Sequence, residues 1–386
     1  MRRNDTMIYF DNSATTQPFR EVLEAFVKIN EQYYANPASI HEAGVEANAL
    51  LTRARHQIAK IINTELEHIV FTSGGTESNN LAIFSLARQQ AHIGKHIITT
   101  AIEHPSILEA MHVLATQGYD ITYLPVNAVG EVALKDVQQA LRKDTVLVSI
   151  MHVNNEIGAV QPITEIAKLV HAQSRAFFHV DAVQSFGKLP IAFVGDAGPD
   201  CITISGHKIH GLKGTGLLAF RKRPLLPAQI VGGGQEFGIR SGTVAVAQNV
   251  VLAKAMRLAF DEQSTYFANY IKWRHELVAT LLDLPDVKVV STKQGAPHII
   301  TFAVKELRGE ILINALQGKG LLVSTSSACS SKQQQTSHVL EAIKLDPRYK
   351  KGVVRMSMGA LTTAKEVTEA ARILRTVITQ LKGASL

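Results

Sequence analysis

The sequence contains the run Cys201-Ile202-Thr203-Ile204-Ser205-Gly206-His207-Lys208, in which a short apolar segment passes into a polar turn. An apolar run of this length is typical of a strand that is covered on both faces of a sheet. A lysine just after such a strand lies where α/β proteins bind ligands, and lysine forms Schiff bases once its surroundings lower its pKa. On this run alone, an ordinary solvated lysine is the better interpretation.

Further buried strands are predicted on the N-terminal side of this run. They are short, rich in β-branched residues and not alternating: His68–Phe71, His96–Thr99, Thr145–Ile150 and Ala176–Val180. Helical patterns lie between some of them, at Asn79–Gln90 and Ile163–Gln173. Strands that alternate with helices indicate a doubly wound α/β domain with a mostly parallel sheet.

The C-terminal part mixes both kinds of element and indicates a smaller α+β domain. The pattern predicts one long helix over residues 246–283, strands at Pro297–Val304 and Gly352–Met356, and helices at Glu310–Gln317 and Ala364–Lys382. We assign residues 15–258 to the large domain, and residues 1–14 with 259–386 to the small one. The segment Ser324–Ser337 is rich in Ser, Thr and Gln, so we expect an exposed, mobile loop there.

The composition excludes several classes of protein. Hydrophobic residues make up 46% and charged residues 19% of the 386 residues, which excludes a disordered chain. Two cysteines cannot form a disulfide scaffold and indicate a reducing cytoplasm. We find no apolar run of the roughly 18 residues that a membrane helix needs, and no apolar core of a signal peptide. We therefore expect a cytoplasmic protein without a membrane partner.

The formal net charge of +7 allows two interpretations. A basic chain can present a surface for nucleic acid, or it can be an enzyme with anionic ligands. No run of five like charges occurs, so we favour the enzyme over direct nucleic-acid binding.

Two more runs carry candidate chemistry. Phe71–Ser78 passes from a strand through Gly74 and Gly75 into a helix, and a helix N-terminus binds anions such as phosphate. The alternative there is a plain turn with Thr76 as the helix cap. Asp181 ends an apolar strand, where a carboxylate would keep the pyridine nitrogen of pyridoxal phosphate protonated. The alternative is an aspartate that caps the next helix.

The two cysteines have opposite surroundings. Cys329 lies among hydroxylic residues with Lys332 nearby, which argues against burial and suits a nucleophilic thiol. Cys201 begins an apolar strand and is predicted to lie in the core.

Two other patterns are discounted. Gly214–Ala219 fits a dinucleotide-binding motif formally, but it precedes a strand-like run instead of opening a helix. His207 and His210 have no carboxylate or cysteine at metal-ligand spacing, so we predict no metal site.

Together, these runs and several others resemble the cysteine desulfurases of the NifS/IscS type, within the class-V aminotransferase family. The matching motifs span nearly the whole chain: Ile8–Thr16, Asn36–Ser39, Glu103–His104, Met151–Gly158, Ser205–Lys208, Arg240–Thr243 and Arg355–Gly359. The resemblance implies fold type I of the pyridoxal-phosphate-dependent transferases and pyridoxal 5'-phosphate as cofactor.

The resemblance also implies roles for single residues. Lys208 would bind the cofactor covalently and move protons at the substrate, Asp181 would pair with the pyridinium nitrogen, and His104 would stack on the ring and act in proton transfer. The other implied cofactor contacts are the phosphate ligands Gly75, Thr76, Ser205 and His207, and Asn155 and Gln184 near the phenolic oxygen. Thr243 would reach the phosphate of the partner subunit's cofactor, which implies a homodimer. Arg355 would bind the substrate carboxylate, with Asn36 nearby.

The implied reaction converts L-cysteine to L-alanine. Cys329 would take the sulfur as a persulfide and pass it to an acceptor protein, such as a tRNA 2-thiouridylase or an iron–sulfur scaffold. The loop lacks the glycine that the family often carries before its cysteine, and the chain ends soon after its last predicted helix, so the acceptor stays open. The alternatives are a selenocysteine lyase, another class-V enzyme, or a non-catalytic sulfur-transfer or RNA-associated protein.

Overall fold

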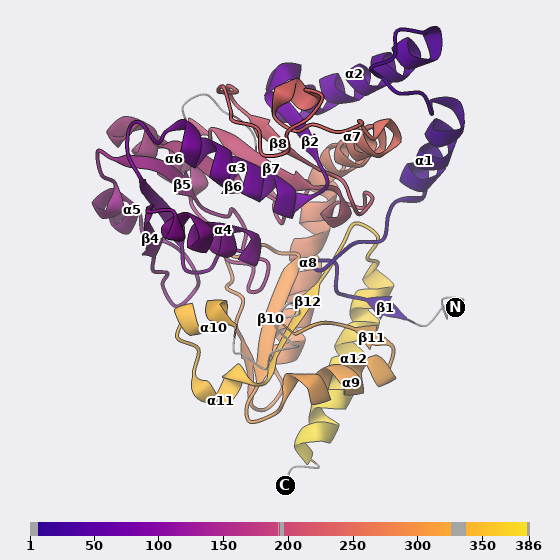
Figure 1. The fold of residues 1–386 in the computed structure, drawn as a ribbon. Coiled ribbons are helices and arrows are strands. Elements are labelled where there is room, and N and C mark those ends of the chain that lie inside the picture. The colour runs from indigo at the N-terminus through magenta and orange to yellow at the C-terminus, as the bar shows by residue number, and fades with distance from the viewer. Residues whose placement is uncertain (1–6, 192, 194–196, 326–336, 384–386) are drawn as a thin grey trace.

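Seven strands form the central sheet of the computed structural model, which describes residues 7–191, 193, 197–325 and 337–383 (Figure 1). The sheet order is β2-β8-β7-β6-β5-β3-β4. The bounds are β2 (Ile69–Thr72), β3 (His96–Thr100), β4 (Asp120–Leu124), β5 (Thr145–Ser149), β6 (Phe177–Asp181), β7 (Cys201–Ser205) and β8 (Gly216–Phe220). β8 runs in the opposite direction to the other six strands, and the pairs that do not include β8 are parallel. The predicted α/β class with a mostly parallel sheet is confirmed.

Helices cover both faces of this sheet, which explains why its strands are apolar throughout. Along β8, Leu217 and Ala219 belong to one buried hydrophobic cluster, while Leu218 and Phe220 belong to another. Alternate side chains of a strand point to opposite faces, so each cluster fills one face. The first cluster includes residues of α2 (Glu42–Ile62), α6 (Ile163–Gln173) and α7 (Val246–Asp261). The second includes residues of α3 (Gly75–Gln89) and α4 (Pro105–Thr116).

The remaining helices of the sheet region are α1 and α5. α1 (Arg20–Gln32) packs on α7, and α5 (Leu134–Ala140) packs on α6. No helix in the described part of the chain is long and apolar enough to cross a membrane.

A second group of elements lies below the large sheet in Figure 1. Its antiparallel sheet has the order β12-β10-β9 and is accompanied by five helices. The bounds are α8 (Gln263–Leu282), β9 (Val287–Val289), β10 (Ile299–Val304), α9 (Gly309–Gly318), α10 (His338–Ala342), α11 (Pro347–Lys350), β12 (Val353–Ser357) and α12 (Ala364–Gly383). The N-terminal strand β1 (Ile8–Tyr9) pairs in parallel with β11 (Leu321–Leu322), so the N-terminal segment joins this C-terminal group. The exact domain boundaries at residues 14/15 and 258/259 stay a prediction.

One prediction about the elements was wrong. The long helix over residues 246–283 is two helices, because Glu262 leaves the helical conformation with φ −101° and ψ 6°. The break lets α7 pack on the large-sheet side while α8 packs on α12. The segment Ser324–Ser337, predicted to be an exposed loop, lies mostly outside the described residues. Its first and last residues are described and buried, with Ser324 bonded to Arg355 and Ser337 bonded to Glu156.

Candidate active site

A cavity of about 310 Å³ lies at the carboxyl ends of the central strands. It is the position at which open α/β sheets bind ligands. Ten residues predicted from the sequence line it: Gly75, Thr76, His104, Asn155, Asp181, Gln184, Ser205, His207, Lys208 and Arg355. The fold thus brings together residues that are up to 280 positions apart in the chain.

Lys208 ends a single 3₁₀ turn, Gly206–Lys208, directly after β7. Its Nζ donates to the carbonyl oxygens of Ser13 and Ala14, at 2.5 and 2.8 Å. The N-terminal segment is fixed over the turn because the Thr16 amide donates to the His207 carbonyl at 2.8 Å. The segment therefore holds the lysine amine in the cavity through two backbone acceptors.

Asp181, the last residue of β6, is buried, and two donors hold its carboxylate. One carboxylate oxygen accepts from the Val183 amide at 2.9 Å, and the other accepts from Asn79 Nδ2 at 2.8 Å. The Asn79 amide also donates to Ser106 Oγ at 2.9 Å, and Ser106 Oγ lies 2.8 Å from His104 Nδ1. These contacts join Asp181 to His104, which is the residue before α4, through two buried polar side chains.

Burial sets the charge of several groups around the cavity. Burial lowers the pKa of His104, with Lys208 and His338 acting in the same direction and Asp181 against them. Burial lowers the pKa of His207 to about 4 and that of Lys188 to about 7, and raises that of Glu103 to about 8. His104 and His207 are therefore neutral near pH 7, and the Glu103 carboxyl is mostly protonated.

A second feature, the N-terminus of α3, fits a phosphate group. Gly74 has φ +150°, a conformation that favours glycine, and the helix begins at Gly75. The first amides of a helix lack intrahelical partners and point outward as anion donors. Beside them, Ser205 Oγ is buried and has no hydrogen-bond partner among the described residues. A phosphate here would give this hydroxyl a partner, so the residues present fit pyridoxal phosphate.

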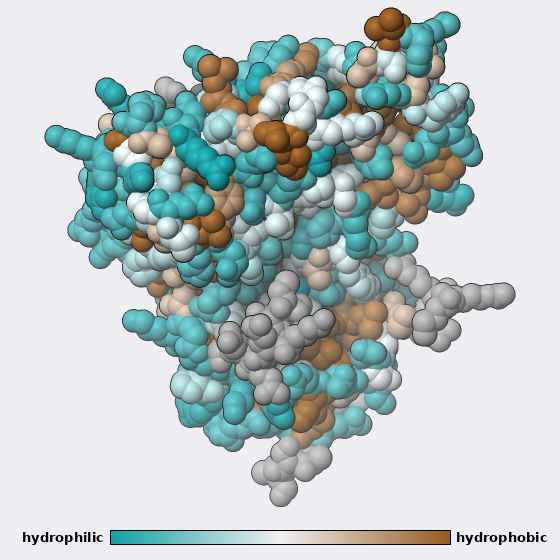
Figure 2. Space-filling view, viewed as in Figure 1, coloured by the Kyte–Doolittle hydropathy of each residue, from teal (hydrophilic) through white to brown (hydrophobic). Residues whose placement is uncertain are grey.

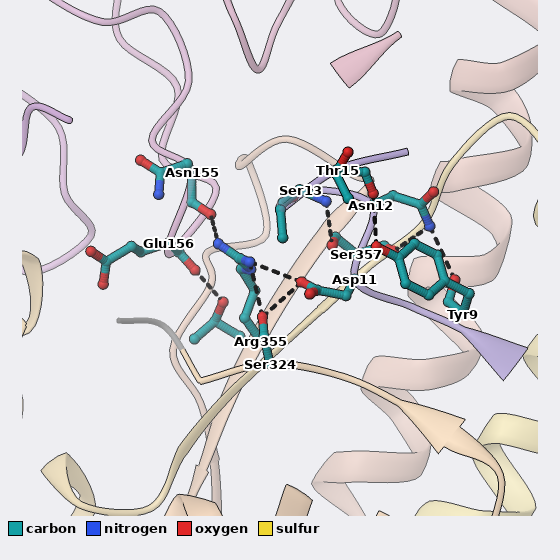
Figure 3. Close-up of polar contacts among 12 residues, drawn as sticks. Tyr9, Asp11, Asn12, Ser13, Thr15, Asn155, Glu156, Ser324, Arg355 and Ser357 are labelled. Atoms are coloured by element: carbon teal, nitrogen blue, oxygen red, sulfur yellow. Dashed lines mark hydrogen bonds and ion pairs between the residues drawn. The ribbon is translucent and has the colours of Figure 1, made fainter. Parts of the chain in front are cut away.

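Arg355 on β12 forms the third feature of the cavity (Figure 3). Its guanidinium is only 3% exposed and donates to the Asn155 carbonyl at 2.8 Å, Asp11 Oδ1 at 3.0 Å and Ser324 Oγ at 2.9 Å. The Nε atom is buried and has no partner among the described residues. Protein contacts thus fix the two terminal nitrogens of the guanidinium, while the Nε–H donor is left for an anionic ligand.

Two predicted residues, Asn36 and Thr243, do not line the cavity of this chain. Asn36 is exposed between α1 and α2, where its Oδ1 accepts from the Ala38 amide at 3.0 Å. Thr243 is exposed before α7. Cys329 lies outside the described residues. The other cysteine, Cys201, is fully buried in β7 as predicted, and burial raises the pKa of its thiol well above the usual value.

The sequence did not predict several residues of the cavity: Ser13, Ala14, Asn79, Pro105, Ser106, Met151, Val153, Glu156, Val183 and His338. Some of them, such as Ser13 and Glu156, lie inside motifs that were already singled out. Asn79 was missed because the predicted helix began at residue 79, whereas α3 begins at Gly75 and places Asn79 one turn inside it. No pattern in the sequence marks Ser106.

Comparisons with known proteins agree with this geometry. The family Aminotransferase class-V matches residues 8–369. The "Cysteine desulfurase IscS" of Dictyoglomus turgidum is 39% identical over 380 residues, which are 98% of this chain and 96% of the relative. The protein of the same name from Klebsiella pneumoniae is 40% identical over 384 residues, which are 98% of this chain and 94% of the relative.

Solved structures give the same result. A structure titled as a NifS-like protein has a TM-score of 0.91 and 35% identity, and the match covers 97% of this chain and 99% of that one. The NifS-like protein of Rickettsia africae has a TM-score of 0.85 and 30% identity, with 96% and 99% covered. The chain therefore belongs to the class-V aminotransferase family and, within it, to the cysteine desulfurases of the NifS/IscS type.

Proposed function

We propose that this protein converts L-cysteine to L-alanine with pyridoxal phosphate and holds the sulfur as a persulfide on Cys329. The observation that carries the proposal is the cavity in which Lys208, Asp181, His104 and Arg355 meet. A covalent anchor, a carboxylate for the ring nitrogen, a ring-stacking imidazole and a carboxylate-binding arginine are the groups that this chemistry needs.

The cofactor contacts follow from the three features of the cavity. Lys208 would bind the aldehyde carbon, Asp181 would face the ring nitrogen and His104 would cover the ring. The phosphate would lie at the start of α3, held by Gly75, Thr76, Ser205 and His207. Asn155 and Gln184 would contact the phenolic oxygen. When bound, the cofactor withdraws electrons from the substrate and so lets its carbon–sulfur bond break.

Arg355 would orient the substrate. Its Nε, which has no partner among the described residues, would donate to the substrate carboxylate, while Asp11 and Ser324 hold the other end of the guanidinium (Figure 3). We keep Asn36 as a second proposed substrate contact, which requires a position different from the exposed one it has in the single chain. The Lys208 amine would take the proton from the substrate Cα once the substrate amine has replaced it.

Sulfur transfer would then be a balanced exchange. The Cys329 thiolate attacks the substrate sulfur, a sulfur–sulfur bond forms, the carbon–sulfur bond breaks, and the substrate carbon is protonated to give alanine. One cysteine and one protein thiol become one alanine and one protein persulfide, so no oxidant is needed. The persulfide would pass to an acceptor protein in the cytoplasm, for which we propose a tRNA 2-thiouridylase or an iron–sulfur scaffold.

We further propose a homodimer in which Thr243 reaches the cofactor phosphate of the partner subunit. Large hydrophobic side chains are strongly exposed on the single chain: Ile40 by 98%, Leu225 by 89%, Tyr34 by 84% and Val231 by 82%. Figure 2 shows hydrophobic groups standing out on the otherwise hydrophilic upper part of the molecule. Exposed apolar groups of this size support a protein interface there.

The test is product analysis with the purified protein, pyridoxal phosphate and L-cysteine. We expect one alanine per sulfur released to a thiol acceptor over many turnovers. A wild-type protein that binds the cofactor but makes no alanine would contradict the proposal.

A further inference from the structure

Asn79 and Ser106 connect two residues to which the proposed function gives separate roles. Asn79 is 1% exposed and donates both protons of its side-chain amide, to Asp181 Oδ2 at 2.8 Å and to Ser106 Oγ at 2.9 Å. Ser106 is 8% exposed, and its Oγ lies 2.8 Å from His104 Nδ1. The four side chains come from α3, α4, β6 and the residue before α4, so the connection depends on the tertiary fold.

The chemistry of the groups fixes the direction of every hydrogen bond in this chain. A carboxylate can only accept, so Asp181 orients the amide of Asn79 with its NH₂ group inward. At the other end, the Ser106 backbone N–H can only donate, and it donates to His104 Nδ1 at 3.2 Å. Nδ1 is therefore an acceptor, and the Ser106 hydroxyl, whose oxygen already accepts from Asn79, donates to it as well. A neutral His104 then carries its proton on Nε2.

The unpaired carbonyl oxygen of the Asn79 side chain supports this assignment of donors and acceptors. This Oδ1 atom is buried without a partner among the described residues. Leaving a buried acceptor unpaired is unfavourable. The two hydrogen bonds that the Asn79 NH₂ group donates must therefore outweigh this penalty and fix the side chain in its orientation.

We propose that Asn79 and Ser106 are positioning residues that hold His104 in the Nε2-protonated tautomer and hold Asp181 in one orientation toward the cofactor. The inference rests on the proposed function, because the two positioned residues act only on bound cofactor and substrate. The charged and titratable groups that face His104 are Asp181 on β6, Lys208 after β7 and His338 on α10. Burial, Lys208 and His338 lower the pKa of His104, and Asp181 raises it. The net effect is a lowered pKa, so the ring is neutral near pH 7, and only a neutral ring has two tautomers.

The experiment is nitrogen NMR of the full-length protein with pyridoxal phosphate bound and histidine labelled with ¹⁵N. His104 is assigned as the ring whose signals are missing in His104→Gln. We expect wild-type Nδ1 to be unprotonated and Nε2 to be protonated. The longer contact from the Ser106 backbone amide, at 3.2 Å, remains in every variant, so Ser106→Ala and Asn79→Ala should lower the fraction of the Nε2-protonated tautomer without abolishing it. Ser106→Thr, which keeps the hydroxyl, should retain the wild-type signals.

Cofactor affinity separates the two positions. Asn79→Ala should raise the dissociation constant of pyridoxal phosphate about tenfold, because a bond to a charged carboxylate is lost. Ser106→Ala should change it less than about twofold, since Asp181 keeps its contact with Asn79. The matched control is Asn80→Ala, because in the described part of the chain the Asn80 side chain donates to the backbone carbonyls of Thr76 and Ser106 and to no side chain.

Two results would overturn the inference: a wild-type His104 with its proton on Nδ1, or an unchanged tautomer in both alanine variants. The measurements need no turnover, so a wild-type protein that fails to make alanine contradicts the proposed function in a separate assay.

Discussion

At the scale of single residues, the contacts of the Lys208 amine determine its position in the cavity. Two backbone carbonyls hold its amine, and neither can give or take a proton. The amine is therefore positioned without a competing titratable partner among these two contacts. This arrangement suits a group that must bind an aldehyde, leave it and then act as a base.

We predict that Lys208→Ala lowers alanine formation at least about a hundredfold, because the covalent and proton-transfer roles both rest on this amine. The fold should persist, as judged by circular dichroism. Lys213→Ala, in the same loop but exposed, serves as the control and should keep its activity. Normal turnover by Lys208→Ala would remove this residue from the mechanism.

Asp11 is the anionic partner of Arg355, and its removal should affect substrate binding. We predict that Asp11→Ala raises KM for L-cysteine about tenfold with a smaller change in kcat, because the guanidinium loses a charged hydrogen bond at 3.0 Å. The control is Glu24→Ala, which removes an arginine–carboxylate pair on the exposed surface. An unchanged KM for Asp11→Ala would contradict the positioning of Arg355 described here.

At the scale of elements, two histidine side chains of the central sheet each form hydrogen bonds to both neighbouring strands. His179 on β6 bonds to Ser149 Oγ of β5 at 2.9 Å and to Thr203 Oγ1 of β7 at 3.0 Å. His96 on β3 bonds in the same way to Thr145 of β5 and Thr122 of β4. These side-chain bonds tie neighbouring strands together in the middle of an otherwise apolar layer.

The His179 contact predicts a pH dependence of stability. Burial lowers the pKa of His179 to about 3, so below pH 6.5 the unfolded chain binds a proton that the folded chain does not. Stability from this group is present above pH 6.5 and is lost as the pH falls toward 3, by up to about 1.4 kcal/mol per pH unit.

Urea unfolding between pH 7.5 and 4.5 measures this effect. Other buried histidines add slopes of the same sign, so the comparison is between wild type and His179→Gln, which should show the shallower loss of stability. His92→Gln, at an exposed position, should keep the wild-type slope. Equal slopes for His179→Gln and wild type would contradict the assignment.

Some strands of the central sheet could be predicted from the sequence and others could not. Buried strands such as β3 and β5 were predictable because a strand with both faces covered has to be apolar and β-branched. β4 was missed, since Asp120–Leu124 lies at the sheet edge and is largely not buried. The reversed direction of β8 was missed too, although the connection over residues 206–215 is too short for a parallel crossover.

At the scale of the whole molecule, the features that could not be predicted from the sequence are those that depend on contacts between distant segments. Residues with a characteristic local motif, such as Ser205–Lys208, were found from the sequence. The contacts of Asp11 with Arg355 and of Asn79 with Asp181 join side chains 344 and 102 positions apart, so no local pattern contains them. The break at Glu262 follows from α7 and α8 packing on different partners, which a helical pattern alone does not contain.

The proposed homodimer makes a prediction for mixed subunits. If Thr243 serves the partner's site, a hybrid of Lys208→Ala and Thr243→Ala subunits contains one intact site. We expect sedimentation of wild type at about twice the mass of one chain, and hybrids that regain tight cofactor binding at one site. A hybrid in which both sites stay impaired would place Thr243 in the site of its own subunit.

The central claim is that sulfur rests on the thiol of Cys329, and mass spectrometry of the protein after incubation with L-cysteine tests it most directly. We predict one added sulfur on the peptide with Cys329, and none on the protein in Cys329→Ser, because a serine hydroxyl is hardly ionised at neutral pH. Cys201→Ser should still carry the sulfur, with a stability loss of about 1–3 kcal/mol from the buried hydroxyl. An added sulfur on Cys201, or sulfur delivery by Cys329→Ser, would contradict the account.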